Sequence, residues 1–201
     1  MKTLLIDFDD SFTFNISSEL FFDKQPHDCI HYTQLENILA NERDLHIILG
    51  PGPGHPDEYS DIIKLIKKYF TRLDIRWSGI CLGHQLIWTS LGAKITTSSN
   101  ILHGSSQNIF IGELGNKLFG KSLITVQRYN SLCVNNSNLP GKLDRNTRLV
   151  FDENGELMLS VGKNFMTYQF HPESIGTSYR NSFFKALNYN NNNAFENRWD
   201  L

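Results

Sequence analysis

The sequence holds only three cysteines, and their spacing forms no recognisable pattern. Cys29, Cys81 and Cys133 are an odd number, and no two lie at the short separation of a zinc-binding pair. This argues against a disulfide framework and against a zinc site, so we expect no metal and no other cofactor. At least one thiol is therefore free to take part in chemistry.

An excess of charge of one sign is also missing. The chain carries 19 basic and 21 acidic residues, which gives a formal net charge of -2. Such a balance supplies no general attraction to nucleic acid or to anionic lipid. We expect neither as a partner, so partners must be inferred from the sites.

Long apolar runs are absent as well. No stretch approaches the length needed to span a membrane, and the first apolar run is too short and too acidic for a signal peptide, since it reaches Asp9 and Asp10. We therefore predict a cytoplasmic protein with no membrane partner. Its 201 residues, 40% of them hydrophobic, suffice for one compact domain but are few for two.

The first half of the chain alternates short apolar runs with amphipathic segments. The predicted strands cover residues 3–8, 46–49 and 74–80, and the predicted helices cover residues 11–22, 59–70 and 82–91. This βαβ order favours an α/β fold with a mostly parallel central sheet and helices on both of its faces.

The second half, after Gly92, contains shorter strand-sized pieces separated by Gly, Asn and Pro. The predicted strands are residues 107–111, 123–127, 148–151, 157–161 and 166–170, followed by a helix over 178–188. This half is expected to add antiparallel strands. The asparagine-rich residues after Tyr189 form a polar tail to which no chemistry can be assigned.

The sharpest local feature is Gly79-Ile80-Cys81-Leu82-Gly83, at the junction of a predicted strand and a predicted helix. It has the Gly-x-Cys-x-Gly form of a nucleophile elbow, in which the glycines let strand and helix approach closely. The helix N-terminus favours a thiolate, and the N–H of Leu82 would point toward a developing oxyanion. The alternative is a buried structural cysteine beside glycines that merely end a strand.

A cysteine nucleophile needs a base, and His171 in His171-Pro172-Glu173 is the best candidate. Residues two apart in an extended segment point to the same side, so Glu173 is able to lie beside the imidazole and orient it. Cys81, His171 and Glu173 then form a set of nucleophile, base and orienting carboxylate. By itself, a histidine before a proline is as often only a turn residue.

A third piece is the loop Gly50-Pro51-Gly52-Pro53-Gly54, which follows an apolar strand. Its glycines and prolines make a stiff loop whose backbone approaches a ligand closely, and the N–H of Gly52 would serve the same oxyanion as that of Leu82. The loop lacks the Gly-Lys-Ser/Thr ending of a P-loop, so phosphate binding is the weaker interpretation. A rigid connector is the remaining alternative.

Together these motifs resemble the class I glutamine amidotransferases, in particular the small subunits of anthranilate synthase and of aminodeoxychorismate (para-aminobenzoate) synthase. The resemblance extends over almost the full length. It is carried by Leu5 to Asn15, Pro51 to Gly54, Gly79 to Gln85, Ile101 to Gly104, Arg128 to Leu132, and Gln169 to Ser174.

The resemblance implies a flavodoxin-like amidotransferase domain over residues 1–189, with a polar tail over 190–201. It also implies a catalytic triad of Cys81, His171 and Glu173. The substrate, L-glutamine, would be held by Gly52, Pro53, Gly54, Gln85 and the backbone around Ser131 and Leu132, beside the N–H of Leu82. The ammonia released would pass to a partner, a chorismate-converting synthase large subunit.

Two positions depart from the pattern of the resembled family. Asn130 stands where the family usually has histidine, and Ser105 where it commonly has lysine after His103-Gly104. Neither position belongs to the implied triad, so the departures concern contact with the partner or its coupling to glutamine hydrolysis.

Three alternatives remain open from the sequence. The first is a stand-alone cysteine hydrolase of the same fold that acts on another amide or γ-glutamyl compound. The second is a flavodoxin-like binding module in which Ser11-Phe12-Thr13 cradles a phosphate, although the glycines typical of such a turn are missing. The third, a degenerate regulatory subunit, is disfavoured because the residues of the triad are intact.

Overall fold

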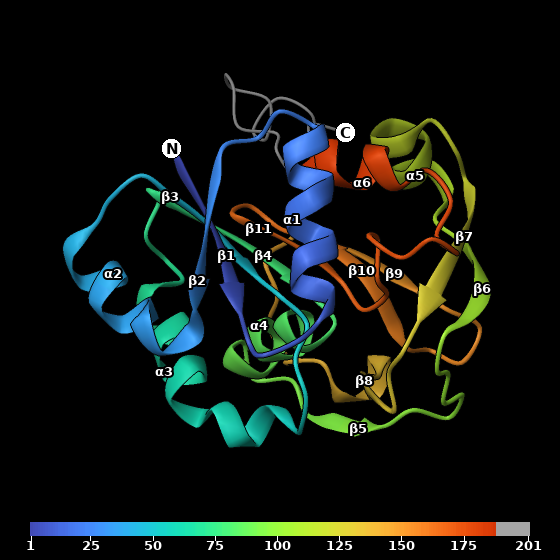
Figure 1. Ribbon diagram of the computed structural model, residues 1–201. Helices are drawn as coiled ribbons and strands as arrows, with labels where there is room; N and C mark the ends of the chain where they lie inside the picture. Colours follow the sequence, from blue (N-terminus) through green and yellow to red (C-terminus); the bar gives the residue numbers. More distant parts are fainter. Residues whose placement is uncertain (188–201) are drawn as a thin grey trace.

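The computed structural model describes residues 1–187, and its centre is a seven-stranded sheet of order β2-β1-β3-β4-β11-β10-β9 (Figure 1). The strands are β1 (Lys2–Asp7), β2 (His27–His31), β3 (Leu45–Leu49), β4 (Ile75–Ile80), β9 (Arg148–Phe151), β10 (Leu157–Val161) and β11 (Phe165–Tyr168). Five of them, β2, β1, β3, β4 and β11, pair in parallel. The β10 strand is antiparallel to both β11 and β9.

Helices cover both faces of this sheet. The α-helices are α1 (Phe12–Phe22), α2 (Leu35–Asn41), α3 (Ser60–Tyr69), α4 (Leu82–Ser90), α5 (Gly112–Phe119) and α6 (Arg180–Leu187), and the short 3-10 helices are η1 (Tyr32–Gln34), η2 (Pro56–Tyr59) and η3 (Asn136–Asn138). Two buried cores result: one packs the sheet against α2, α3 and α4, and the other packs it against α1, α5 and α6. Successive residues of β1 point to opposite faces, so Leu4 and Ile6 enter the first core and Leu5 enters the second.

Two small antiparallel sheets lie beside the central one. β5 (Ile95–Thr97) pairs with β8 (Leu132–Val134), and β6 (Ser105–Phe110) pairs with β7 (Leu123–Arg128). They occupy the lower and right-hand parts of Figure 1, next to β9 and β10. These sheets and the β9-β10-β11 segment confirm the α/β fold with antiparallel additions in the second half.

The predicted elements are present with ends displaced by at most two residues, but β2, α2, β5, α5 and β8 were given no predicted range. The strands β5 and β8 have three residues each, too few to show an alternating pattern. The helix α5 begins at a glycine and has no side-chain cap, and α2 has only seven residues, although Leu35, Ile38 and Leu39 have helical spacing. Isolated helices this short are stabilised chiefly by tertiary packing, which local sequence does not reveal.

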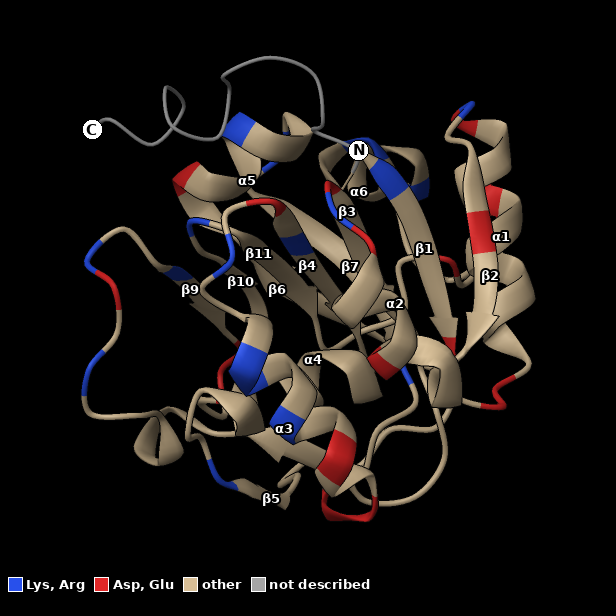
Figure 2. Ribbon diagram, turned by 90° about the vertical axis from the view of Figure 1, so that its left-hand side faces the viewer, with Lys and Arg blue, Asp and Glu red and all other residues tan. Residues whose placement is uncertain are grey.

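The predicted boundary between a domain over 1–189 and a tail over 190–201 lies outside the described residues, as does the predicted end of the last helix at residue 188. Within residues 1–187, no helix is both long and apolar enough to cross a lipid bilayer. Basic and acidic residues are interspersed over the face that carries α3 (Figure 2), where Asp61 lies one turn from Lys64.

Candidate active site

Cys81 sits in a sharp turn between β4 and α4. Its backbone adopts φ 52° and ψ -102°, a conformation that side-chain-bearing residues rarely occupy. The turn is held by the Cys81 N–H, which donates to the carbonyl of Tyr168 at the end of β11 (2.9 Å), and by the Gln85 N–H, which donates to the carbonyl of Cys81 (3.2 Å). Hydrogen bonds of both the N–H and the carbonyl of Cys81 therefore hold the strained backbone, as expected for an elbow that presents a nucleophile.

The two glycines of the elbow have the mechanical role that their spacing predicted. A Cβ atom on Gly83 would overlap the carbonyl oxygen of Leu49 at the end of β3, and one on Gly79 would come within 2.5 Å of the Gly83 carbonyl. The Gly83 N–H also donates to the carbonyl of Gly50 (3.1 Å). The helix therefore packs directly on the ends of the two central strands.

His171 lies just beyond the end of β11, close to Cys81. Its Nδ1 is 2.6 Å from Oε1 of Glu173, and both side chains are almost fully buried. Its backbone pairs with Gln127 of β7, since the His171 N–H donates to the carbonyl of Gln127 (3.0 Å). The other ring nitrogen, Nε2, has no hydrogen-bond partner among the described residues, so it is available for the thiol and for a substrate.

The electrostatics of His171 favour its charged form. Burial lowers the pKa of the imidazole, but the carboxylate of Glu173 and the sulfur of Cys81 raise it by more, so it lies well above its ordinary value of 6.5. Phe12 and Tyr129 pack against the ring with centroid separations of 4.9 Å each. The aromatic rings exclude water from the pair, which strengthens the attraction between imidazolium and carboxylate.

The loop after β3 packs against the elbow. A Cβ atom on Gly52 would come within 2.5 Å of the Leu82 side chain, so only glycine allows this approach. In residues 1–187, neither the Gly52 N–H nor the Leu82 N–H donates to a protein acceptor. Pro53 lies next in the loop, where its carbonyl accepts from the Tyr59 hydroxyl (3.1 Å), and Gly54 follows with φ 78°.

Gln85 joins the elbow helix to the loop before β8. Its Nε2 donates to the carbonyl of Leu132 (2.9 Å) and to Oε1 of Gln169 (3.1 Å). Ser131 precedes Leu132, and its carbonyl accepts from the N–H of Ser98 (2.8 Å). All the predicted site residues thus lie on segments that converge on Cys81: the loop after β3, the start of α4, the loop before β8 and the segment after β11.

The sequence matches the family described as glutamine amidotransferase class-I over residues 4–189. The chain belongs to the class I glutamine amidotransferases.

Three curated relatives show what this amidotransferase is similar to in sequence. Anthranilate synthase component 2 of Cyanidium caldarium is 38% identical over 189 residues, which cover 87% of this chain and 91% of that one. The protein of the same name from Pseudomonas aeruginosa is 34% identical over 184 residues, covering 87% and 88%. The bifunctional protein TrpGD of Thermotoga maritima is 32% identical, covering 88% of this chain but 30% of that longer protein.

Solved structures share the amidotransferase fold. A putative GMP synthase component from Thermoplasma acidophilum superimposes with a TM-score of 0.76, covering 93% of this chain and 92% of that one at 20% identity. A glutamine amidotransferase from Thermotoga maritima superimposes with a TM-score of 0.66, covering 86% and 76% at 19% identity.

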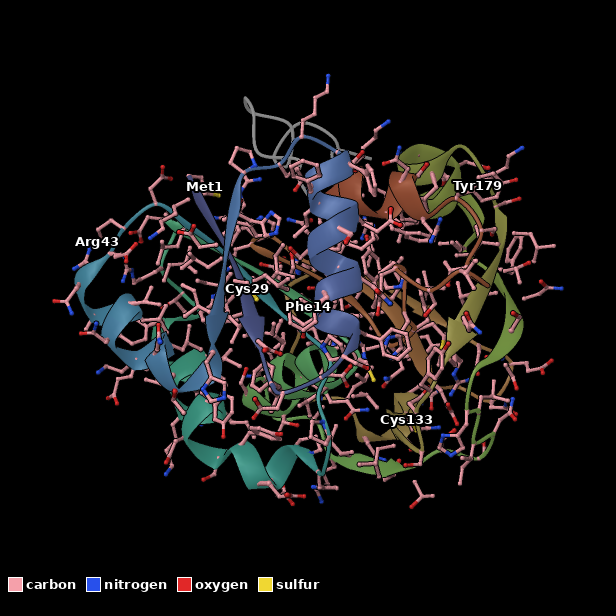
Figure 3. The ribbon with its side chains drawn as sticks, in the orientation of Figure 1. Met1, Phe14, Cys29, Arg43, Cys133 and Tyr179 are labelled. Carbon is pink, nitrogen blue, oxygen red and sulfur yellow. The ribbon has the colours of Figure 1, made fainter. Side chains whose placement is uncertain are left out.

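The other two thiols of the amidotransferase are poor nucleophile candidates. Cys29 lies on β2 and Cys133 lies on β8, as their labels in Figure 3 show, so neither belongs to the turn between β4 and α4. Burial raises the pKa of the Cys133 thiol to about 11, and nearby Glu156 adds to the rise. Burial and then Asp7 also raise the pKa of the Cys29 thiol.

Two buried histidines are excluded as bases. Burial lowers the pKa of His84 to about 3, and its Nδ1 lies 2.8 Å from Oγ1 of Thr167 on β11. Burial and Arg76 lower the pKa of His46 to about 3. Both are buried packing residues that stay neutral at physiological pH. Within residues 1–187, no group of three or more His, Cys, Asp or Glu side chains is arranged to hold a metal ion.

The turn at the start of α1 caps the helix. The side chain of Asp10 accepts from the Phe12 N–H (2.8 Å), and its carbonyl accepts from the Thr13 N–H (3.0 Å). Because these donors are already used, the turn does not offer them to a phosphate.

The sequence did not reveal the buried ionic cluster behind the loop before β8. Arg128, with none of its side chain exposed, donates to Glu156 (2.6 Å) and contacts Asp152 (3.3 Å). Ser98 and the N–H of Ser99 also donate to Glu156. Burial raises the pKa of Glu156, but hydrogen bonds from Ser98 and Arg128 lower it by more. Since 28 positions separate Arg128 from Glu156, no local pattern could have paired them.

Proposed function

We propose that this amidotransferase hydrolyses L-glutamine with a triad of Cys81, His171 and Glu173, and that it supplies ammonia to a synthase subunit that converts chorismate. The observation that carries the proposal is the strained Cys81 turn beside an imidazole whose Nδ1 is bound to a buried carboxylate at 2.6 Å. Nucleophile, base and orienting group in this arrangement are the equipment of covalent acyl transfer.

In the first half of the reaction, the Cys81 thiolate attacks the side-chain carbonyl carbon of glutamine. The electrons of the carbonyl pass to its oxygen, which accepts hydrogen bonds from the Leu82 N–H and the Gly52 N–H. The oxyanion collapses, the carbon–nitrogen bond breaks, and His171 gives its proton to the leaving nitrogen. The products are ammonia and a γ-glutamyl thioester on Cys81.

In the second half, water enters and His171 accepts one of its protons as the oxygen attacks the thioester carbonyl. Collapse of the second oxyanion expels the Cys81 thiolate and leaves glutamate. Glu173 holds the ring in one orientation through both steps and stabilises the imidazolium. The substrate glutamine is held by the loop of Gly52, Pro53 and Gly54, by Gln85, and by the backbone of Ser131 and Leu132.

The relatives named anthranilate synthase component 2 support a partner that makes anthranilate. A partner that makes 4-amino-4-deoxychorismate is the second candidate, because the motifs of the two subunit types are shared. Reconstitution with each large subunit decides between them: the aromatic amine formed from chorismate and glutamine identifies the partner.

The test of the proposed chemistry is Cys81→Ser in the complex with the large subunit. Glutamine-dependent synthesis should fall by about 10³-fold or more, while synthesis from ammonium salts continues at the wild-type rate. Cys29→Ser, the same change at an exposed thiol, is the matched control and should leave both rates unchanged. Full glutamine-dependent activity in Cys81→Ser would refute the proposal.

The stand-alone hydrolase alternative gives a different result in the same assay. It predicts steady turnover of an amide or γ-glutamyl substrate by the isolated chain, unaffected by any large subunit. The proposal predicts that addition of chorismate together with the large subunit changes the rate of glutamine hydrolysis.

A further inference from the structure

Asn130 links the buried ionic cluster to the backbone of the glutamine site. Its side chain is buried, with 4% of the residue exposed. The amide oxygen accepts from Nε of Arg128 (3.0 Å), and the amide nitrogen donates to the carbonyl of Leu132 (2.9 Å). The Asn130 side chain therefore accepts a hydrogen bond from Arg128 and donates one to Leu132.

The Arg128 guanidinium is itself held rigidly. Nη2 donates to Glu156 (2.6 Å), and Nη1 donates to Oε1 of Gln107 (2.7 Å) and contacts Asp152 (3.3 Å). With the other nitrogens engaged, Nε is directed at Asn130. A cation has no lone pair to offer, so the oxygen of the Asn130 amide must face Arg128 and its nitrogen must face Leu132.

The carbonyl of Leu132 is a shared acceptor. It takes the hydrogen bond from Asn130 and a second one from Nε2 of Gln85 (2.9 Å), which also donates to Gln169 (3.1 Å). Gln85 lies on the helix that begins after Cys81, and Gln169 lies two positions before His171. A displacement of the Leu132 carbonyl would therefore move groups on both sides of the catalytic pair.

We propose that Asn130 is a positioning residue for glutamine recognition. Held by Arg128, its amide fixes the Ser131–Leu132 backbone and, through the shared Leu132 carbonyl, the side chain of Gln85. The proposal rests on the proposed function, in which these groups hold the substrate. It assigns Asn130 an effect on substrate affinity and none on the intrinsic reactivity of Cys81.

Two substitutions of Asn130 distinguish the effects of its two hydrogen bonds, to Arg128 and to Leu132. In Asn130→Asp the carboxylate still accepts from Arg128, but it has no donor, and its second oxygen faces the Leu132 carbonyl and repels it. In Asn130→His the neutral imidazole supplies one acceptor and one donor, as the amide does. The aspartate variant therefore loses the positioning contact while keeping the contact with the cluster.

The probe is 6-diazo-5-oxo-L-norleucine, a glutamine analogue that alkylates nucleophiles, used on the full chain at pH 8. The saturation constant is the analogue concentration that gives half of the maximal inactivation rate. We expect it to rise roughly tenfold in Asn130→Asp, the effect of one lost buried hydrogen bond. The limiting rate of inactivation and the rate of Cys81 alkylation by iodoacetamide should stay at the wild-type values. Asn130→His should lie within about threefold of the wild type.

Asn146→Asp is the matched control, because Asn146 lies near the surface in the loop before β9. It makes the same chemical change and should leave the saturation constant unchanged. An unchanged saturation constant in folded Asn130→Asp would overturn the inference. The inference would also be overturned if the rates of inactivation by the analogue and of alkylation by iodoacetamide fell together in Asn130→Asp. An Asn130→His variant as impaired as Asn130→Asp would overturn it as well. Failure of the wild-type chain to react with the analogue would refute the proposed function instead.

Discussion

At the scale of single residues, the proposed chemistry depends on a buried charge pair. The imidazole of His171 faces Glu173 on one side and Cys81 on the other, inside a shell that includes Phe12 and Tyr129. In such surroundings a carboxylate attracts a proton onto the ring more strongly than in water. The same attraction, which in the proposed mechanism prepares His171 to protonate ammonia, also contributes to folding.

This contribution should depend on pH. Because the pKa of His171 is raised in the folded protein, the folded state binds the proton more tightly than the unfolded state. The stabilisation is fully present below pH 6.5 and is lost as the pH rises through the raised pKa. We predict that the excess unfolding free energy of the wild type over His171→Gln falls with pH above about 6.5, by at most about 1.4 kcal/mol per pH unit.

Denaturant titrations of both proteins between about pH 6 and pH 9 measure this difference. His103→Gln is the control, because His103 is exposed and its side chain hydrogen-bonds to no described residue. The unfolding free energy of His103→Gln gives the baseline for replacing an exposed histidine with glutamine. A difference for His171→Gln that is independent of pH would show that the carboxylate does not hold a proton on the ring.

The ionic cluster gives a second prediction at this scale. Arg128→Met would leave the carboxylates of Glu156 and Asp152 buried without their counter-ion, which costs about 3–5 kcal/mol of folding free energy. Adding Glu156→Gln should recover part of the loss, since the amide removes one buried charge. Urea unfolding of the single and double variants checks this, and an additive double variant would contradict the electrostatic coupling.

At the scale of elements, the elbow is a junction of two strands and a helix that only glycine permits. Its sequence form was sufficient to place Cys81 between β4 and α4, because Gly79 and Gly83 stand at the points of close contact. The position of His171 beside Cys81 was less accessible to prediction. It depends on β11 lying next to β4, and that pairing joins segments more than eighty residues apart.

We predict that Gly83→Ala destabilises the fold although alanine is the better helix former. The gain in helix propensity is about 1 kcal/mol, whereas the new methyl group would overlap the Leu49 carbonyl and cost about 1–3 kcal/mol or more. Thermal unfolding should show a lower midpoint. Gly141→Ala is the control, since a Cβ atom there meets nothing within 4 Å; a midpoint for Gly83→Ala equal to that of the control would contradict the close packing.

At the scale of the whole molecule, the doubly covered sheet brings the site together at the ends of its central strands. The βαβ order of the sequence predicted that sheet, since the hydrophobic pattern of the parallel strands is local. The Arg128 cluster, the role of Asn130, and the helices α2 and α5 were not predicted, because they depend on contacts between distant segments. The glutamine contacts proposed for this site come from the resembled motifs, because burial and periodicity alone do not specify them.

The proposed attack of Cys81 on glutamine is tested most directly by mass-spectrometric mapping of the full chain. The chain is mapped after reaction with 6-diazo-5-oxo-L-norleucine, with and without excess glutamine. We expect one adduct, on the peptide that contains Cys81, and we expect excess glutamine to suppress it. An adduct on Cys29 or Cys133, or an adduct on Cys81 that glutamine does not suppress, would contradict the proposed attack.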